Sequence, residues 1–115
     1  MTTVFGITNC DTVRKARRWL DDHAIRYRFH DFRKDGLNAE LLEDWLSRIE
    51  WERLVNRKGR TFRTLGKDRT ASLNRDAAMV LMLEHPTIIK RPVVEVNGRL
   101  LVGFDEALYR DAFDR

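Results

Sequence analysis

The amino-acid sequence predicts an α/β fold in which a β-α-β unit is followed by a helical insertion and then by a β-β-α unit. Three observations support this order. Short β-branched and aromatic runs lie near both ends of the chain, apolar residues recur at helical spacing between them, and an Asn-Gly pair separates two apolar runs near the C-terminus. At 115 residues the chain is expected to form one domain, residues 1–115, with the helical insertion at about 36–86.

The N-terminal segment predicts the β-α-β unit. Residues 3–8 read as a strand that stops at Asn9, and residues 25–32 alternate as a second strand. Between them, residues 11–23 carry apolar side chains at helical spacing, namely Val13, Ala16, Trp19 and Leu20. This spacing favours a parallel pair of strands joined by a helix.

The spacing of apolar residues changes twice between the middle and the end of the chain. Asn38 is a predicted N-cap, and a later helix is expected to start at Ser72 or Asn74 and to end before Pro86. Residues 93–96 and 99–102 flank the Asn-Gly pair and predict a hairpin, which Gly103 ends before a closing helix over 105–113.

The net charge of +4 comes from one segment. Residues 53–69 carry seven basic residues and one acidic residue, and with Gly59 and Gly66 this stretch is expected to be irregular. A local basic segment is typical of a site for an anionic small molecule or an acidic partner, and equally of a solvated loop. Because a general nucleic-acid binder carries its basic charge more widely, we expect no direct nucleic-acid binding.

Composition excludes several classes of protein. A hydrophobic fraction of 43% beside 35% charged residues is typical of a globular chain. No apolar run approaches the roughly 20 residues that span a bilayer, and the N-terminus lacks the pattern of a secretory signal. One cysteine forms no intrachain disulfide, and the three histidines are scattered. We therefore expect a cytoplasmic protein with no membrane partner, no metal site and no tightly bound cofactor.

Cys10 lies between the first predicted strand and the first predicted helix. A thiol at the first turn of a helix faces unpaired backbone N–H groups and the positive end of the helix dipole, which favour the nucleophilic thiolate. Asn9 and Thr12 can hydrogen-bond to the sulfur, whereas the Asp11 carboxylate opposes ionisation unless the helix terminus or an arginine offsets its charge. The position favours a reactive thiol over a buried, inert cysteine.

Arg91-Pro92 directly precedes the third predicted strand. A proline at this place can be cis, and the preceding backbone would then be exposed to a ligand. The pair is also compatible with an ordinary strand start beside a surface charge.

Three segments of the chain resemble the arsenate reductase (ArsC) family, in its Spx/YffB-like branch. They are residues 8–16 around Cys10, residues 83–94 with His-Pro and Lys-Arg-Pro, and residues 102–106. A helix that ends in His-Pro before Lys-Arg-Pro and a strand, with a cysteine near residue 10, is a specific combination. The resemblance covers essentially the whole chain and implies a thioredoxin-like fold, a four-stranded mixed sheet with an inserted helical subdomain.

The resemblance also implies functional residues. Cys10 would be the catalytic, redox-active thiol, and Arg91 would hold an anion beside a cis-Pro92. In thioredoxin-like folds the backbone before the cis-proline pairs with the cysteinyl part of glutathione, which maps to Arg91 and Pro92. The γ-glutamyl group of glutathione would be held between Gly103 and Asp105, at the start of the last helix.

This sequence departs from the arsenate reductases, which hold their oxyanion with three arginines. Arg91 aligns with one of them, Arg57 is the position expected for the second, and Val102-Gly103-Phe104 stands where the third would fall. The loss of one arginine removes a charge-assisted contact, and Asp11 repels an approaching dianion. Arsenate is therefore disfavoured as the substrate.

The third residue after Cys10 is Val13, and the chain has no second cysteine, so a mixed disulfide at Cys10 must be resolved by an external thiol. Glutathione is the expected cosubstrate in a reducing cytoplasm. We predict a glutathione-dependent thiol-disulfide reductase whose substrate is an oxidised thiol, with proteins among the candidates. Two alternatives stay open: a non-enzymatic Spx-like regulator that binds the RNA polymerase α subunit through residues 53–69, and an arsenate reductase that works with glutathione and glutaredoxin.

Overall fold

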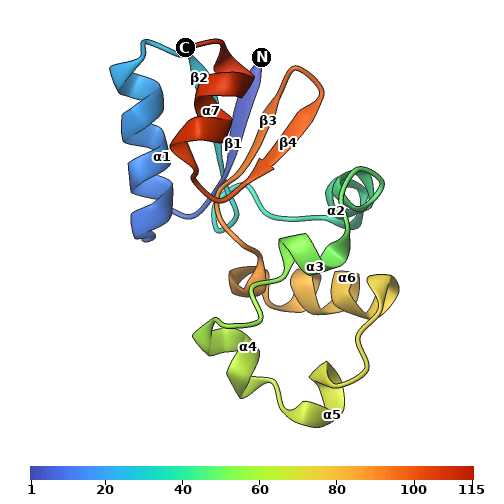
Figure 1. The fold of residues 1–115 in the computed structure, drawn as a ribbon. Helices are drawn as coiled ribbons and strands as arrows, with labels where there is room; N and C mark the ends of the chain where they lie inside the picture. The colour runs from blue at the N-terminus through green and yellow to red at the C-terminus, as the bar shows by residue number, and fades with distance from the viewer. The chain divides into compact units, whose positions relative to one another are not determined.

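The computed structural model describes all residues, 1–115, and the chain divides into two compact units. The sheet unit comprises Met1–Gly36 and Arg91–Arg115, and the helical unit comprises Leu37–Lys90. Figure 1 shows the strands in the first unit and a group of helices in the second.

The sheet unit is built on four strands. They are β1 (Thr2–Gly6), β2 (Tyr27–Asp31), β3 (Val93–Val96) and β4 (Arg99–Val102), in the spatial order β2-β1-β3-β4. β1 pairs with β2 in parallel, whereas β3 pairs antiparallel with both β1 and β4. The predicted α/β class with a four-stranded mixed sheet is therefore confirmed.

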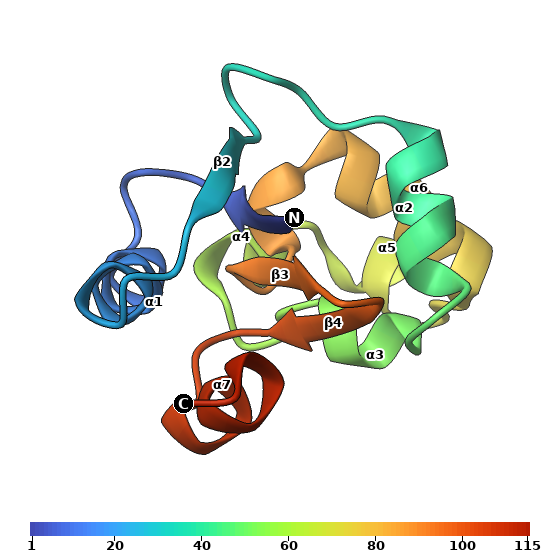
Figure 2. The ribbon, with the colours of Figure 1, turned by 90° about the horizontal axis from the view of Figure 1, so that it is seen from above.

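Helices α1 (Asp11–Asp22) and α7 (Glu106–Phe113) cover one face of this sheet. Figure 2 shows both helices on the same side of the strands. Their apolar faces pack on alternate strand residues and form one core, which consists of Val4, Ala16, Trp19, Leu20, Val94, Val96, Leu101, Tyr109 and Ala112. Trp19 meets the Tyr109 ring edge-on, with centroids 5.6 Å apart, so an aromatic contact joins the two helices.

Local signals placed several of the element ends correctly. Asn97 and Gly98 have φ angles of 48° and 77°, the left-handed values that a tight hairpin turn of this type requires. Each of the N-caps Asn38, Asn74 and Asp105 accepts a hydrogen bond from the backbone N–H three residues later. The predicted hairpin and the N-cap at Asn38 are confirmed, and of the two expected starts of the later helix the structure has Asn74. The closing helix, expected from Asp105, begins one residue later with Asp105 as its N-cap.

The helical unit contains α2 (Ala39–Leu46), α3 (Trp51–Leu54), α4 (Arg60–Thr64), α5 (Lys67–Thr70), α6 (Arg75–Glu84) and a single 3-10 turn, Pro86–Ile88. α6 packs against α2 and α3. The buried side chains of this unit come chiefly from these three helices and from residues 88 and 89; they are Leu42, Trp45, Leu46, Leu54, Val55, Ala78, Leu81, Met82, Ile88 and Ile89.

The expectation of an irregular basic segment was wrong. Gly59 precedes α4, and Gly66, with a φ of 86°, separates α4 from α5. Each glycine therefore stands directly before a short helix, and residues 60–64, which lie between the two glycines, form α4. Neither helix has a buried residue, so neither shows the helical spacing of apolar residues from which a helix is predicted.

Candidate functional site

Cys10 is the residue immediately before α1 and has an extended backbone, with φ −152° and ψ 123°. β1 ends at Gly6, so the thiol lies in the strand-to-helix junction, as predicted. Its carbonyl oxygen accepts from the Arg14 N–H at 3.0 Å, the first hydrogen bond of the helix. The residue is a free cysteine of intermediate exposure.

The charge of Asp11, which opposes ionisation of the neighbouring thiol, is paired in the structure. Arg14 Nη1 lies 2.5 Å from Asp11 Oδ1, and Arg14 Nη2 donates to Asn9 Oδ1 at 3.3 Å. Arg14 was not among the predicted site residues, although its position three residues after Asp11 on a helix is a recognisable signal. Because the pair is exposed, its energy is small, but it draws the carboxylate and the Asn9 side chain toward the arginine. Thr12 lies half-buried in the first turn of α1.

The peptide bond between Arg91 and Pro92 is cis. Pro92 is buried and Arg91 is half-buried, and the pair leads directly into β3. The carbonyl oxygen of Pro92 accepts from the Gly103 N–H at 2.8 Å, so this segment is tied to the turn after β4.

The turn from Gly103 to Asp105 connects β4 to α7. Gly103 has a φ of 80°, a left-handed value that favours glycine. Asp105 Oδ1 accepts from the Leu108 N–H at 3.2 Å and caps α7. Since a carboxylate has two acceptor oxygens, the cap leaves Oδ2 able to accept from a ligand.

Strand register brings these three segments to the same end of the sheet. Phe5, near the end of β1, pairs with Val93, the first residue of β3, which in turn pairs with Val102, the last residue of β4. The chain that leaves β1 toward Cys10, the chain that enters β3 and the turn after β4 therefore emerge together, as Figure 1 shows at the lower end of the strands. The sheet unit thus holds all the predicted site residues except Arg57: Asn9, Cys10, Thr12, Arg91, Pro92, Gly103 and Asp105.

Arg57 belongs to the helical unit. Its guanidinium lies over the Trp51 ring, 5.6 Å from the centroid, which limits the freedom of an otherwise exposed side chain. Arg57, Lys58 and Lys90 line a pocket of about 210 Å³ in which Glu52 is the only acidic residue. The pocket is therefore suited to an anion, and within this unit Lys58 and Lys90 accompany the predicted Arg57.

Sequence reasoning missed Tyr109 as a neighbour of the site. Its hydroxyl donates to the Gly103 carbonyl oxygen at 2.8 Å, and its burial raises the pKa of the phenol above its ordinary value. The residue was predicted only as part of a helix, because a tyrosine on the apolar face of a helix is usually core. Tyr109 follows the capping Asp105 by four residues, so it lies one helical turn from the preceding loop. This spacing is the sequence signal that could have indicated its contact with the loop.

No group of three or more His, Cys, Asp or Glu side chains is arranged to hold a metal ion. None of the helices has both the length and the apolar character needed to cross a bilayer.

Known proteins resemble this chain over nearly its whole length. The sequence model of the ArsC family matches residues 5–112. The structure of the YffB protein has a TM-score of 0.94 with this chain at 44% identity, over 97% of this chain and 98% of the other. An arsenate reductase (ArsC) related protein from Brucella melitensis has a TM-score of 0.79 at 48% identity, over 99% and 95% of the two chains. The global transcriptional regulator Spx of Streptococcus agalactiae serotype V is 32% identical over 108 residues, which are 92% of this chain and 78% of Spx.

These comparisons confirm two predictions, the thioredoxin-like fold and the resemblance to Spx- and YffB-like proteins. They relate the chain both to arsenate reductases and to transcriptional regulators. With the family model matching from residue 5 to residue 112, the chain belongs to the ArsC family.

Proposed function

We propose that the protein is a glutathione-dependent thiol-disulfide reductase in which Cys10 is the catalytic nucleophile. The observation that supports this most directly is the register of the sheet. It brings the free, half-buried Cys10 at the start of α1 to the same sheet end as Arg91-Pro92 and the Gly103–Asp105 turn. A nucleophile and two segments suited to a peptide ligand thus share one end of the sheet unit.

The reaction proceeds by thiol-disulfide exchange and needs no group other than thiols. The Cys10 thiolate attacks one sulfur of the oxidised substrate, a Cys10–substrate disulfide forms, and the second substrate sulfur leaves as a thiolate and takes up a proton. A glutathione thiolate then attacks Cys10, which releases the first substrate thiol and leaves a Cys10–glutathione disulfide. A second glutathione attacks the glutathione sulfur, restores the Cys10 thiolate and forms glutathione disulfide. The two electrons gained by the substrate come from the two glutathione thiols.

The residues around Cys10 take separate roles in this cycle. Arg91 holds negative charge near the sulfur, and Asn9, before Cys10, and Thr12, in the first turn of α1, supply polar groups. The backbone before cis-Pro92, at Arg91, pairs with the cysteinyl part of glutathione, and Gly103 to Asp105 hold its γ-glutamyl group. Arg57, in the helical unit, binds an anionic group of a substrate or cosubstrate in the pocket that it shares with Lys58 and Lys90.

The test is glutathione-dependent reduction of hydroxyethyl disulfide by the native protein, Cys10→Ser and Thr8→Ser. We expect activity in the native protein and in Thr8→Ser, an exposed residue of the same loop, and none above background in Cys10→Ser. Full activity in Cys10→Ser, or no activity in the native protein, would contradict the proposal.

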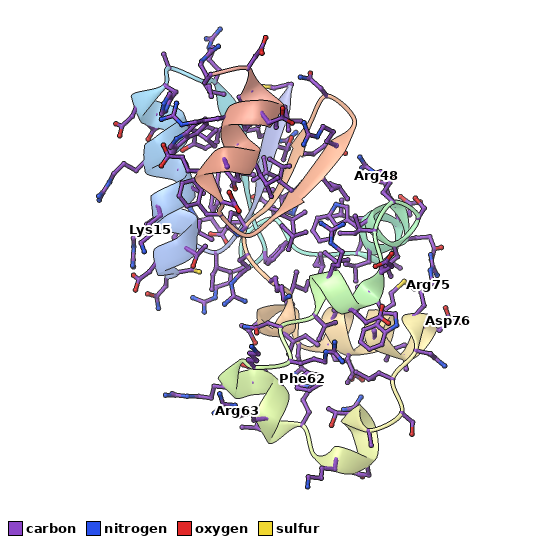
Figure 3. The ribbon with its side chains drawn as sticks, viewed as in Figure 1. Lys15, Arg48, Phe62, Arg63, Arg75 and Asp76 are labelled. Carbon is purple, nitrogen blue, oxygen red and sulfur yellow. The ribbon has the colours of Figure 1, made fainter.

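A second function, regulation of transcription through RNA polymerase, is favoured by one specific observation. The basic segment 53–69 contains the exposed helices α4 and α5, and Figure 3 shows Phe62 and Arg63 on α4. An exposed helix with cations and a half-buried aromatic side chain suits an acidic protein surface. The chain is 32% identical to Spx of Streptococcus agalactiae, a global transcriptional regulator, and the partner implied by the resemblance to the Spx-like branch is the RNA polymerase α subunit.

The two functions are separated by a binding experiment. Immobilised native protein and Arg60→Glu/Arg63→Glu are each incubated with purified RNA polymerase α subunit. A regulator binds in the native form and loses binding when these two charges are reversed, whereas a reductase that acts alone binds in neither form.

A further inference from the structure

Tyr109 connects α7 to the turn that precedes it. The side chain is 1% exposed, and its hydroxyl donates to the Gly103 carbonyl oxygen at 2.8 Å. A buried hydroxyl without a partner is unfavourable, so this hydrogen bond is the one that permits a tyrosine here in place of phenylalanine. Since burial raises the pKa of the phenol, the hydroxyl stays protonated and remains a donor at neutral pH.

The same ring also holds the next residue of the turn. Phe104 meets Tyr109 at 81° with centroids 4.9 Å apart, an edge-to-face contact. Tyr109 therefore fixes two consecutive residues, one through a backbone carbonyl and the other through an aromatic side chain.

The turn is held from its other side by the segment that leads into β3. The Gly103 N–H donates to the Pro92 carbonyl oxygen at 2.8 Å, and Gly103 has a φ of 80°. Gly103 is thus bound through its N–H to Pro92 and through its carbonyl to Tyr109. These two hydrogen bonds fix the direction in which the chain passes from β4 to Asp105.

The turn has the polar groups that an α-amino acid needs. Asp105 Oδ1 is used by the helix cap, which leaves Oδ2 for an ammonium group. The cap uses the Leu108 N–H, so the N–H groups of Glu106 and Ala107 remain in the first turn of α7, and such groups bind carboxylates. The α-ammonium and α-carboxylate of a γ-glutamyl group complement this pair of acceptor and donors.

We propose that Tyr109 is a positioning residue for thiol selectivity, which holds the Gly103–Asp105 turn in the conformation that recognises the γ-glutamyl head of the thiol cosubstrate. The proposal rests on the glutathione-dependent function stated above. It makes the protein selective for γ-glutamyl thiols over thiols that lack this group, such as cysteinylglycine.

The experiment measures kcat and KM for glutathione and for cysteinylglycine in the native protein, Tyr109→Phe and Tyr27→Phe. Tyr109→Phe keeps the ring and its contact with Phe104 but loses the hydrogen bond to Gly103. We expect KM for glutathione to rise about three- to tenfold with kcat within about twofold, and KM for cysteinylglycine to stay unchanged. Tyr27→Phe is the matched control. Tyr27 lies on β2, in the same unit but away from the turn, and its hydroxyl accepts a hydrogen bond from Arg17 of α1.

A second variant, Phe104→Leu, loosens the turn from its side chain and leaves Tyr109 in place. It should show the same selective rise in KM for glutathione. An unchanged KM for glutathione in both variants overturns the role of Tyr109, and so does an equal rise for both thiols, which would indicate general loosening of the fold. Failure of the native protein to use glutathione overturns the proposed function itself, so the two failures are distinguishable.

Discussion

The sheet unit and the helical unit hold their exposed segments by different interactions. In the sheet unit, the turn after β4 is fixed by a buried tyrosine and by the backbone of Pro92. In the helical unit, exposed ion pairs connect the elements, such as Arg75 with Glu43 and Arg69 with Glu84. Buried hydrogen bonds set one geometry, whereas exposed ion pairs are weak and tolerate several. We therefore expect the turn after β4, which is proposed to bind the ligand, to keep one geometry, and the charged surface of the helical unit to be more adaptable.

The largest expected effects come from the two cores, where Leu20→Ala and Leu42→Ala remove side chains with no exposed surface from the sheet unit and the helical unit respectively. Each should lower the free energy of unfolding by about 2–5 kcal/mol. Since each unit is small for independent folding, we expect both variants to shift a single cooperative transition. Urea titration followed by circular dichroism and tryptophan fluorescence checks this. Two separate transitions in Leu42→Ala would show instead that the units unfold independently.

The next effect compares one arginine from each unit. Arg91→Ala should lower kcat/KM about 10- to 100-fold, because a half-buried arginine makes charge-assisted hydrogen bonds to an anion. Arg57→Ala should lower it at most about fivefold, since Arg57 is exposed and screened by solvent. Arg91→Lys keeps the charge but not the planar guanidinium group, and its kcat/KM should lie between those of Arg91→Ala and Arg57→Ala. Equal losses for Arg57→Ala and Arg91→Ala would contradict the division between a rigid site and an adaptable surface.

A smaller effect compares two helix caps. Asn74→Ala and Asp105→Ala each remove the side-chain acceptor at a helix start, and each should cost about 1 kcal/mol of stability. Only Asp105→Ala should also raise KM for glutathione, because Asp105 is proposed to bind the γ-glutamyl group. Thermal unfolding and steady-state kinetics on the same preparations check both parts. A KM increase in Asn74→Ala would show that the kinetic effect follows from lost stability.

The smallest effect is the pH dependence of two exposed ion pairs, one in each unit. The hydrogen bond from Arg75 lowers the pKa of Glu43, and the one from Arg110 lowers the pKa of Glu106. A carboxyl with a lowered pKa in the folded state contributes stability at neutral pH, and the contribution is lost as pH falls through the folded-state pKa. Glu43→Gln and Glu106→Gln should therefore unfold slightly earlier in urea at pH 7, and no earlier than the native protein in strong acid. A matched control is Glu50→Gln, outside both pairs.

Local sequence signals predicted those features that depend on neighbouring residues. The Asn97-Gly98 turn, the N-cap at Asn38 and the end of α6 before Pro86 follow from backbone angles and hydrogen bonds within a few residues. The position of Cys10 between β1 and α1 was predictable in the same way. The short helices α4 and α5 were missed because their side chains are exposed and show no apolar period.

The sequence by itself determined the order of the elements, the single thiol with no resolving partner in the chain, and the local turn and cap geometry, because each depends on residue type and short spacing. Only the tertiary structure decided the strand order β2-β1-β3-β4, which brings the segments of Cys10, Pro92 and Gly103 to one sheet end. It also decided the partners of individual groups, such as the Tyr109 hydroxyl on Gly103. Such contacts depend on how distant strands and helices pack, and no local period encodes that arrangement.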